Sequence, residues 1–108
     1  MLERDIEKYL VAQCKKHNIL CEKFTSPQRR SVPDRILTYS SRVVFLELKA
    51  TGAKPTENQA EDHKRRAYHG ASVYWTDSRV GVDIIIQHLL FGYLVPVGRG
   101  YKVVHDGD

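Results

Sequence analysis

The 108-residue sequence predicts a mixed α/β domain, in which a mixed central β-sheet is flanked by α-helices. Three segments carry helical periodicity or helix caps, and four short segments alternate or are rich in β-forming residues. They follow one another in the order α-β-β-β-α-β-α, with a small C-terminal hairpin after them. The length suits one domain with a modest hydrophobic core.

The first helix is expected over residues 2–17, because apolar side chains recur there at helical spacing. These residues are Leu2, Ile6, Tyr9, Leu10 and Cys14. The segment 18–24, "NILCEKF", alternates between two sets of side chains and predicts a strand. Residues 25–33 are polar and basic and end at a proline, so we expect a loop before the next strand.

Two further strands are expected over 34–39 and 42–50, with a turn at Ser40 and Ser41. One face of the second of these strands is wholly apolar and consists of Val44, Leu46, Leu48 and Ala50. Because side chains alternate along a strand, this face is expected to pack on the core. The other face carries charged residues and is expected to hold the chemistry.

The segment 56–70 predicts the second helix together with its two caps. Thr56 is a suitable N-cap residue, and Gly70 suits the position just after a helix ends. The next segment, 71–76, reads "ASVYWT" and is rich in residues that favour extended structure. It predicts a fourth strand.

Residues 77–90 predict a third helix, although the run "DIII" within this segment would also fit a strand. The tail, 91–108, contains two short β-like segments around Gly98, Arg99 and Gly100. We expect these segments to form a small C-terminal hairpin. The sequence shows no internal repeat and no linker, which favours a single domain.

Composition narrows the classes of function. No apolar run approaches the length of a membrane span, and charges interrupt the amino terminus, so we expect a soluble, intracellular, cytoplasmic protein. Cys14 and Cys21 lack C-x-x-C spacing, and we favour reduced, packed thiols over a redox or metal role. The formal net charge of +4 fits a polyanionic partner without establishing one.

The second and third strands carry charges that a purely structural hairpin would not need. With a two-serine turn, counting back along both strands places Asp34 opposite Glu47. Directly opposed Cβ atoms lie about 4.5–5.5 Å apart and like charges there are destabilising, so a bound divalent cation is the simplest compensation. Lys49 shares a face with Glu47 and would lie beside that cation, where it can orient water. The alternative is a surface hairpin with ordinary ion pairs.

The residues Pro33-Asp34 and Glu47-Leu48-Lys49 resemble the signature of the PD-(D/E)xK nuclease superfamily. More narrowly, "VPDRIL", "VVFLELKA", "TENQ" and "HG", followed by a strand and a short helix, are similar to the virus-type replication-repair nuclease domain, VRR-NUC. The resemblance covers about residues 2–90 and leaves 91–108 outside. It implies a restriction-endonuclease-like core within a single nuclease domain over 1–108, and Mg²⁺- or Mn²⁺-dependent hydrolysis of phosphodiester bonds in DNA.

The resemblance also implies roles for individual residues. In that family a helix-borne glutamate, the motif aspartate and the motif glutamate bind the metal, while the motif lysine assists the attacking water. Carried onto this sequence, the metal ligands include Asp34, Glu47 and the backbone carbonyl of Leu48. Lys49 takes the catalytic role.

Two positions have competing interpretations. Glu3 and Glu7 are both candidates for the helix-borne ligand, and helical geometry favours Glu3 because the apolar stripe lies closer to it. "LERDI" also resembles the first-helix acid motif of archaeal Holliday-junction resolvases. Gln59 fits a capping box with Thr56, whereas the resemblance gives this glutamine an active-site or DNA-backbone role. His63 follows Gln59 by one helical turn and could face phosphate.

Basic side chains on both sides of the expected metal face predict a groove for DNA phosphates. They are Lys23, Arg29, Arg30, Lys54, Lys64, Arg65 and Arg66. The resemblance points to branched DNA and to a Holliday-junction resolvase used in DNA repair, and symmetric cutting would require a homodimer. The alternatives are a non-catalytic DNA-binding module and a nuclease directed at flaps or duplexes.

Overall fold

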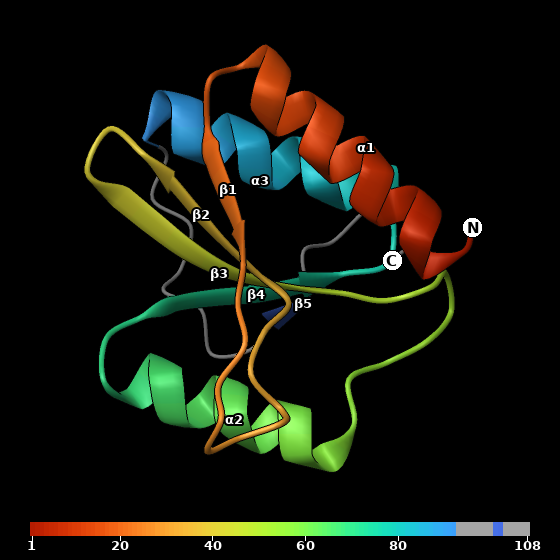
Figure 1. Cartoon of the computed structure of the whole chain (residues 1–108), viewed down its shortest axis with the longest axis vertical. Coiled ribbons are helices and arrows are strands. Elements are labelled where there is room, and N and C mark those ends of the chain that lie inside the picture. The colour runs from red at the N-terminus through yellow and green to blue at the C-terminus, as the bar shows by residue number, and fades with distance from the viewer. Residues whose placement is uncertain (93–100, 103–108) are drawn as a thin grey trace.

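The structure is a computed structural model that describes residues 1–92 and the backbone of 101–102. Its helices and strands follow the predicted order (Figure 1). They are α1 (Glu3–Lys16), β1 (Leu20–Lys23), β2 (Arg35–Tyr39), β3 (Arg42–Leu48), α2 (Glu57–Tyr68), β4 (Ser72–Thr76), α3 (Arg79–Phe91) and β5 (Tyr101–Lys102). Apart from β5, the segment expected to form the C-terminal hairpin lies outside the described residues.

The strands form one sheet in the order β1-β2-β3-β4-β5. β1, β2 and β3 are antiparallel neighbours, whereas β4 pairs in parallel with β3 and with β5. The mixed sheet predicted from the sequence is therefore confirmed. α2 connects the parallel strands β3 and β4 and covers one face of the sheet, while α1 and α3 lie together on the other face (Figure 1).

The main hydrophobic core lies between the sheet and the layer formed by α1 and α3. The helices contribute buried side chains that lie along one face of each: Ile6, Leu10, Cys14, Val82, Ile85, Ile86 and Leu89. Val44, Leu46 and Leu48 of β3 are buried against them, as predicted. Complete burial of one such leucine or isoleucine stabilises the fold by about 1.5–3 kcal/mol, so this layer holds α1 against the sheet.

The face of β3 that carries Glu47 is also covered, which corrects the expectation of packing on one side and open chemistry on the other. α2 lies over it, and the buried residues of this helix are polar: Asp62 and His63. The guanidinium of Arg66 lies over the rings of Phe24 and Phe45, at 4.9 and 5.2 Å from their centroids. Polar and cation–π contacts therefore hold α2 to the sheet in place of an apolar stripe.

The caps of α2 follow the prediction. Thr56 is its N-cap residue, and Gly70 follows its end with φ +94°, in the left-handed region that favours glycine. The third helix is confirmed as well, beginning after the N-cap Ser78, whose hydroxyl accepts a hydrogen bond from the Gly81 amide at 3.0 Å. None of the described helices combines the length and the apolar composition that a bilayer-spanning segment requires.

The turn between β2 and β3 fixes the register of both strands. Tyr39 pairs with Arg42, so Ser40 and Ser41 form a two-residue loop, as predicted. Both serines have positive φ, 48° and 67°, as a type I′ turn requires. Serine adopts this conformation less readily than asparagine or glycine, so the turn is strained.

Replacing the turn with Ser40→Asn and Ser41→Gly should therefore stabilise the protein by about 1 kcal/mol, because both new residues tolerate positive φ. Thermal or urea unfolding measures the change. The double variant Ser40→Thr and Ser41→Thr is the matched control, since it keeps both hydroxyls but adds β-branching and should lower stability. Equal stability of the two variants would contradict a strained turn.

Candidate active site

Asp34 lies immediately before β2, opposite Glu47 of β3. The strand register pairs Arg35 with Leu46, and its continuation by one residue brings Asp34 and Glu47 together, as predicted. The Asp34 carboxylate accepts a hydrogen bond from the Leu48 amide at 2.9 Å through Oδ2. Its backbone carbonyl accepts another from the Phe24 amide at 2.9 Å. Backbone contacts on both sides therefore fix the direction of this carboxylate.

Glu47 is almost fully buried, with 1% of its surface exposed. Its Oε2 accepts a hydrogen bond from Gln59 Nε2 at 3.3 Å and lies 3.7 Å from Lys49 Nζ. Its Oε1 lies 3.9 Å from His63 Nε2, and no donor among the described residues makes a hydrogen bond to it. Lys49 is the cation of this group and keeps 14% of its side chain exposed.

The pKa of Glu47 is raised, chiefly because burial penalises its charged form. Contact with His63 opposes this effect, whereas the neighbouring Asp34 carboxylate, within hydrogen-bonding reach, raises the pKa further. The positive charge of Lys49 lowers it. The two opposed carboxylates therefore interact directly, as the predicted register requires.

The two candidate acids of α1 point to different partners. Burial and the charge of Asp34 raise the pKa of Glu3, and Lys49 opposes them, so the first turn of α1 lies beside the two motif residues. Glu7 instead forms an ion pair with Arg35, with 3.3 Å between Oε2 and Nη2. Glu3 therefore lies on the side of the two motif residues, and its role as the helix-borne ligand stays a prediction.

Gln59 forms the predicted capping box and also contacts Glu47. Its Oε1 accepts a hydrogen bond from the Thr56 amide at 2.8 Å, and its own amide donates to Thr56 Oγ1 at 3.2 Å, which completes the capping box. Its Nε2 donates to the Glu47 carboxylate at 3.3 Å. One side chain therefore starts α2 with its oxygen and orients Glu47 with its nitrogen.

His63 is the residue of this group that the sequence did not place correctly. It is 1% exposed, so it faces the Glu47 carboxylate inside the protein and not an external phosphate. The signal was present in the spacing, because residues four apart share a helix face and Gln59 already pointed to the active site. A polar face of α2 that turns toward the sheet explains both positions.

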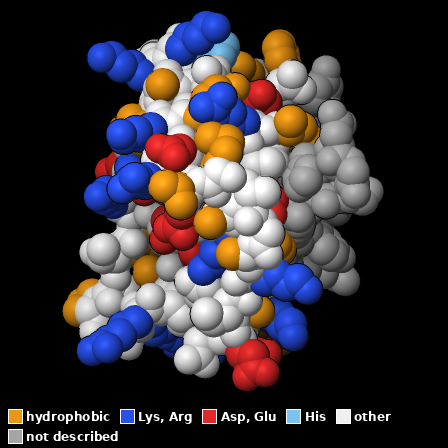
Figure 2. All heavy atoms as spheres, turned by 90° about the vertical axis from the view of Figure 1, so that its right-hand side faces the viewer, with side chains coloured by type: hydrophobic (Ala, Val, Ile, Leu, Met, Phe, Trp, Pro, Cys, Tyr) orange, Lys and Arg blue, Asp and Glu red, His pale blue; other side chains and the backbone are white. Residues whose placement is uncertain are grey.

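The basic residues predicted for DNA binding have different environments. Most are exposed on the surface: Lys23, Arg29, Arg30, Lys54, Lys64 and Arg65. Arg66 is half-buried, because its Nε bonds to the buried Asp62 carboxylate at 2.7 Å and its guanidinium covers two aromatic rings. Its guanidinium is therefore engaged inside the fold. Figure 2 shows several patches of acidic side chains on one face, with Lys and Arg side chains among and around them.

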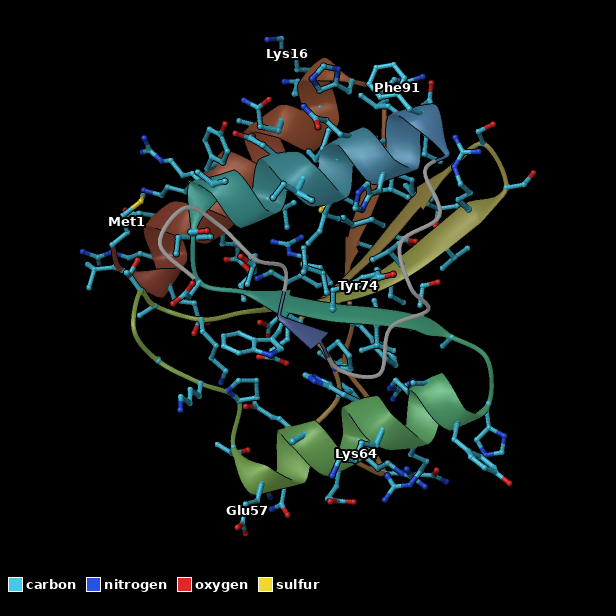
Figure 3. All side chains as sticks on the ribbon, turned by 180° about the vertical axis from the view of Figure 1, so that it is seen from behind. Met1, Lys16, Glu57, Lys64, Tyr74 and Phe91 are labelled. Atoms are coloured by element: carbon cyan, nitrogen blue, oxygen red, sulfur yellow. The ribbon has the colours of Figure 1, made fainter. Side chains whose placement is uncertain are left out.

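The chemistry of these residues fits a hard divalent cation. Within the described part of the chain, no group of three or more His, Cys, Asp or Glu side chains could hold a metal ion. Mg²⁺ needs only one or two protein carboxylates, because it keeps several of its waters. The opposed carboxylates and the buried Glu47 Oε1 without a hydrogen bond provide oxygen atoms of the required kind. The three helices all start toward the edge where β3 ends (Figures 1 and 3).

Comparisons with known proteins identify relatives of this chain and of its fold. No family model matches the chain. A curated protein named "Putative nuclease p44", from Acyrthosiphon pisum secondary endosymbiont phage 1, is 41% identical over 78 residues, which are 71% of this chain and 84% of the relative. A solved structure described as a VRR_NUC domain superimposes with a TM-score of 0.73 and 27% identity, over 80% of this chain and 95% of the other.

A second solved structure, described as a VRR_NUC domain protein, has a TM-score of 0.72 over 96% of this chain and 95% of the other. Because the two sequences are only 16% identical, this similarity shows a shared fold and nothing more. The fold of this chain is therefore also found in two VRR_NUC structures. In this chain, the opposed carboxylates lie at the end of β3.

Burial of Glu47 should reduce stability at neutral pH. A raised pKa means that the folded protein binds this proton more tightly than the unfolded chain, so stability falls as pH rises above the range of an unfolded glutamate. Glu47→Gln removes the charge, and we expect a higher Tm at pH 8 in EDTA. The gain should shrink as pH falls toward about 4, where the wild-type carboxyl is protonated.

Glu57→Gln is the matched control, because Glu57 is an exposed glutamate in the first turn of α2. It should give no gain in Tm at either pH, since a carboxylate at that position favours the helix. A Tm of Glu47→Gln at pH 8 that equals or lies below the wild-type value would show that the buried charge does not destabilise the fold.

Proposed function

This chain belongs to the VRR-NUC family of nucleases, and on that premise we propose that it is a Mg²⁺- or Mn²⁺-dependent endonuclease acting on branched DNA. The observation that carries the proposal is the opposed pair of carboxylates, Asp34 and Glu47, with Lys49 Nζ 3.7 Å from the second of them. Two acids and one partly exposed ammonium at the end of β3 are the groups that metal-assisted phosphodiester hydrolysis requires.

The residues that would hold the metal directly are Asp34, Glu47 and the carbonyl of Leu48. Glu3 lies beside Asp34 but does not form a three-acid group with the two motif residues, so it would act on the metal through a coordinated water. When bound, a divalent cation supplies positive charge to the phosphate and lowers the pKa of a coordinated water. Lys49 keeps part of its side chain exposed and can reach both the water and the phosphate, where its ammonium orients the water and stabilises developing negative charge.

Gln59 and His63 act on Glu47 and do not need to reach the substrate. Gln59 donates to Oε2, and His63 packs against Oε1, so the carboxylate has one orientation between β3 and α2. Keeping a buried carboxylate reduces stability, and a module that only binds DNA would gain nothing from it. This burial supports catalysis over a purely DNA-binding role.

The proposed substrate is a four-way junction or a related branched DNA, cut by a homodimer in DNA repair. The likeness of "LERDI" to the first-helix motif of archaeal junction resolvases supports this substrate, and the place of Glu3 beside Asp34 is consistent with it. The exposed Lys and Arg side chains on the face shown in Figure 2 would contact phosphates, giving salt-sensitive binding with little sequence preference.

Cleavage of a labelled panel tests the nuclease directly. The panel contains a four-way junction, a 5′ flap, a replication fork, a single strand and a linear duplex, each with Mg²⁺, Mn²⁺, Ca²⁺ or EDTA. We expect symmetric nicking of the junction in the lanes with Mg²⁺ or Mn²⁺, and none in the lanes with Ca²⁺ or EDTA. Asp34→Asn and Lys49→Met should each lower the rate by about 100-fold or more, because each removes a charge at the reacting phosphate.

Lys16→Met is the matched control for Lys49→Met, because Lys16 is exposed at the opposite end of α1 from Met1 (Figure 3). It should cut at the wild-type rate. Flap or fork cutting without junction cutting would keep the nuclease and exclude the resolvase. Binding in every lane without cleavage under any metal would exclude both. Full activity of Asp34→Asn would exclude the proposed metal site, whatever DNA is cut.

Symmetric junction cutting also requires two active sites, and we expect a two-fold dimer. Light scattering coupled to size-exclusion chromatography, over a wide range of protein concentration, measures the mass in solution with and without junction DNA. A mass of one chain at every concentration, with and without DNA, would exclude junction resolution by a dimer.

A further inference from the structure

A second group of reactive side chains lies outside the nuclease site, where the end of α1 meets β1. It consists of Cys14, Cys21, Arg35 and Glu7. The turn between the two elements is closed by a hydrogen bond from the Ile19 amide to the Cys14 carbonyl at 2.8 Å. Cys14 lies on the buried face of α1, and Cys21 lies half-buried on β1, so the turn brings the two side chains together. Figure 1 shows β1 starting beside the end of α1.

The environment makes the two thiols unequal. The thiols lie within hydrogen-bonding reach of each other, and this contact, followed by burial, raises the pKa of Cys14. The same contact lowers the pKa of Cys21 to about 7, against the effect of burial. Arg35 donates from Nη1 to Cys21 Sγ at 3.9 Å, and its charge lowers this pKa further, whereas Glu7 raises it. Cys21 is therefore the nucleophile of the pair, and Cys14 is the protected partner.

We propose that Cys14 and Cys21 form a redox-active dithiol, a modification site for hydroperoxides that closes to an intramolecular disulfide. The proposal stands on the packing of both cysteines in one cluster at the closed turn after α1 and on the contact between Arg35 and Cys21, and it does not depend on the nuclease activity. It goes beyond the expectation of reduced, packed thiols, and both cysteines are free in the structure. The turn between α1 and β1 brings the two cysteines together, although they lack C-x-x-C spacing.

The chemistry balances with a hydroperoxide as the oxidant. The Cys21 thiolate attacks the terminal peroxide oxygen, so an S–O bond forms, the O–O bond breaks, and the departing oxygen takes a proton to become water or an alcohol. Cys14 sulfur then attacks the Cys21 sulfur, so an S–S bond forms and the S–O bond breaks. The hydroxide that leaves takes the Cys14 proton and becomes water. An external dithiol reverses the change by disulfide exchange.

Arg35 links this pair to the nuclease site. Its guanidinium contacts Cys21 through Nη1 and Glu7 through Nη2, and its backbone follows Asp34 directly. Disulfide formation removes the thiolate that Arg35 contacts, and leaves Glu7 as its charged partner. The helix that carries Glu7 also carries Glu3 one turn earlier.

Intact-mass spectrometry of the reduced full chain, treated with about one equivalent of hydrogen peroxide at pH 7, tests the proposal. We expect a loss of about 2 Da together with the loss of both titratable thiols, and recovery of both after dithiothreitol. Cys14→Ser should stop at a sulfenic acid on Cys21, trapped by dimedone, and Cys21→Ser should leave Cys14 unmodified. Cys14→Ala serves where Cys14→Ser fails to fold, as circular dichroism will show.

Substitution of the two charged neighbours of Cys21, Glu7 and Arg35, should change its reactivity in opposite directions. Glu7→Gln should speed alkylation of Cys21 by iodoacetamide at pH 6 by about 2-fold or more, because it removes a charge that opposes the thiolate, and Arg35→Gln should slow it. Over-oxidation of Cys21 to a sulfinic acid without a disulfide would overturn the proposal. So would disulfide-linked dimers in place of the internal bond, or faster alkylation of Cys14 than of Cys21.

Discussion

The rest of the structure is arranged around one buried carboxylate. Glu47 lies between the sheet and α2 with 1% of its surface exposed, and an unpaired charge at such a depth would strongly destabilise the fold. Three side chains reduce this penalty: Gln59 by a hydrogen bond, Lys49 by its charge and His63 by packing against the remaining oxygen. Because two of these come from α2, the helix must present a polar face to the sheet. The same constraint explains why this helix, which lacks an apolar stripe, is held by its caps, by polar contacts and by the cation–π contacts of Arg66.

Features that depend on local spacing could be predicted from the sequence. The order of the elements, the two-serine turn and the resulting opposition of Asp34 and Glu47 follow from alternation and turn chemistry, and the structure confirms them. The caps of α2 are local signals as well. The preference for Glu3 over Glu7 came from helical geometry. The ion pair of Glu7 with Arg35 could not be predicted in this way, since Arg35 is distant in sequence.

Features that depend on long-range packing could not be predicted. Nothing in the alternation of β3 shows that its charged face is covered by a helix, because a polar face of a strand ordinarily meets water. His63 and Arg66 were therefore assigned to phosphates, although one is buried against Glu47 and the other bonds to Asp62. The adjacency of Cys14 and Cys21 has the same origin, since it depends on how tightly the turn after α1 closes.

The double use of Gln59 limits how this region can change in evolution. A glutamate at this position could keep the capping box but would present a second carboxylate to Glu47, and an alanine would lose both contacts at once. Asparagine has the right chemical groups but a side chain one methylene too short to reach in both directions. The start of α2 and the orientation of Glu47 therefore vary as one trait. A single substitution at position 59 that weakens the start of α2 will also disturb the orientation of Glu47. Few substitutions at this position are therefore neutral.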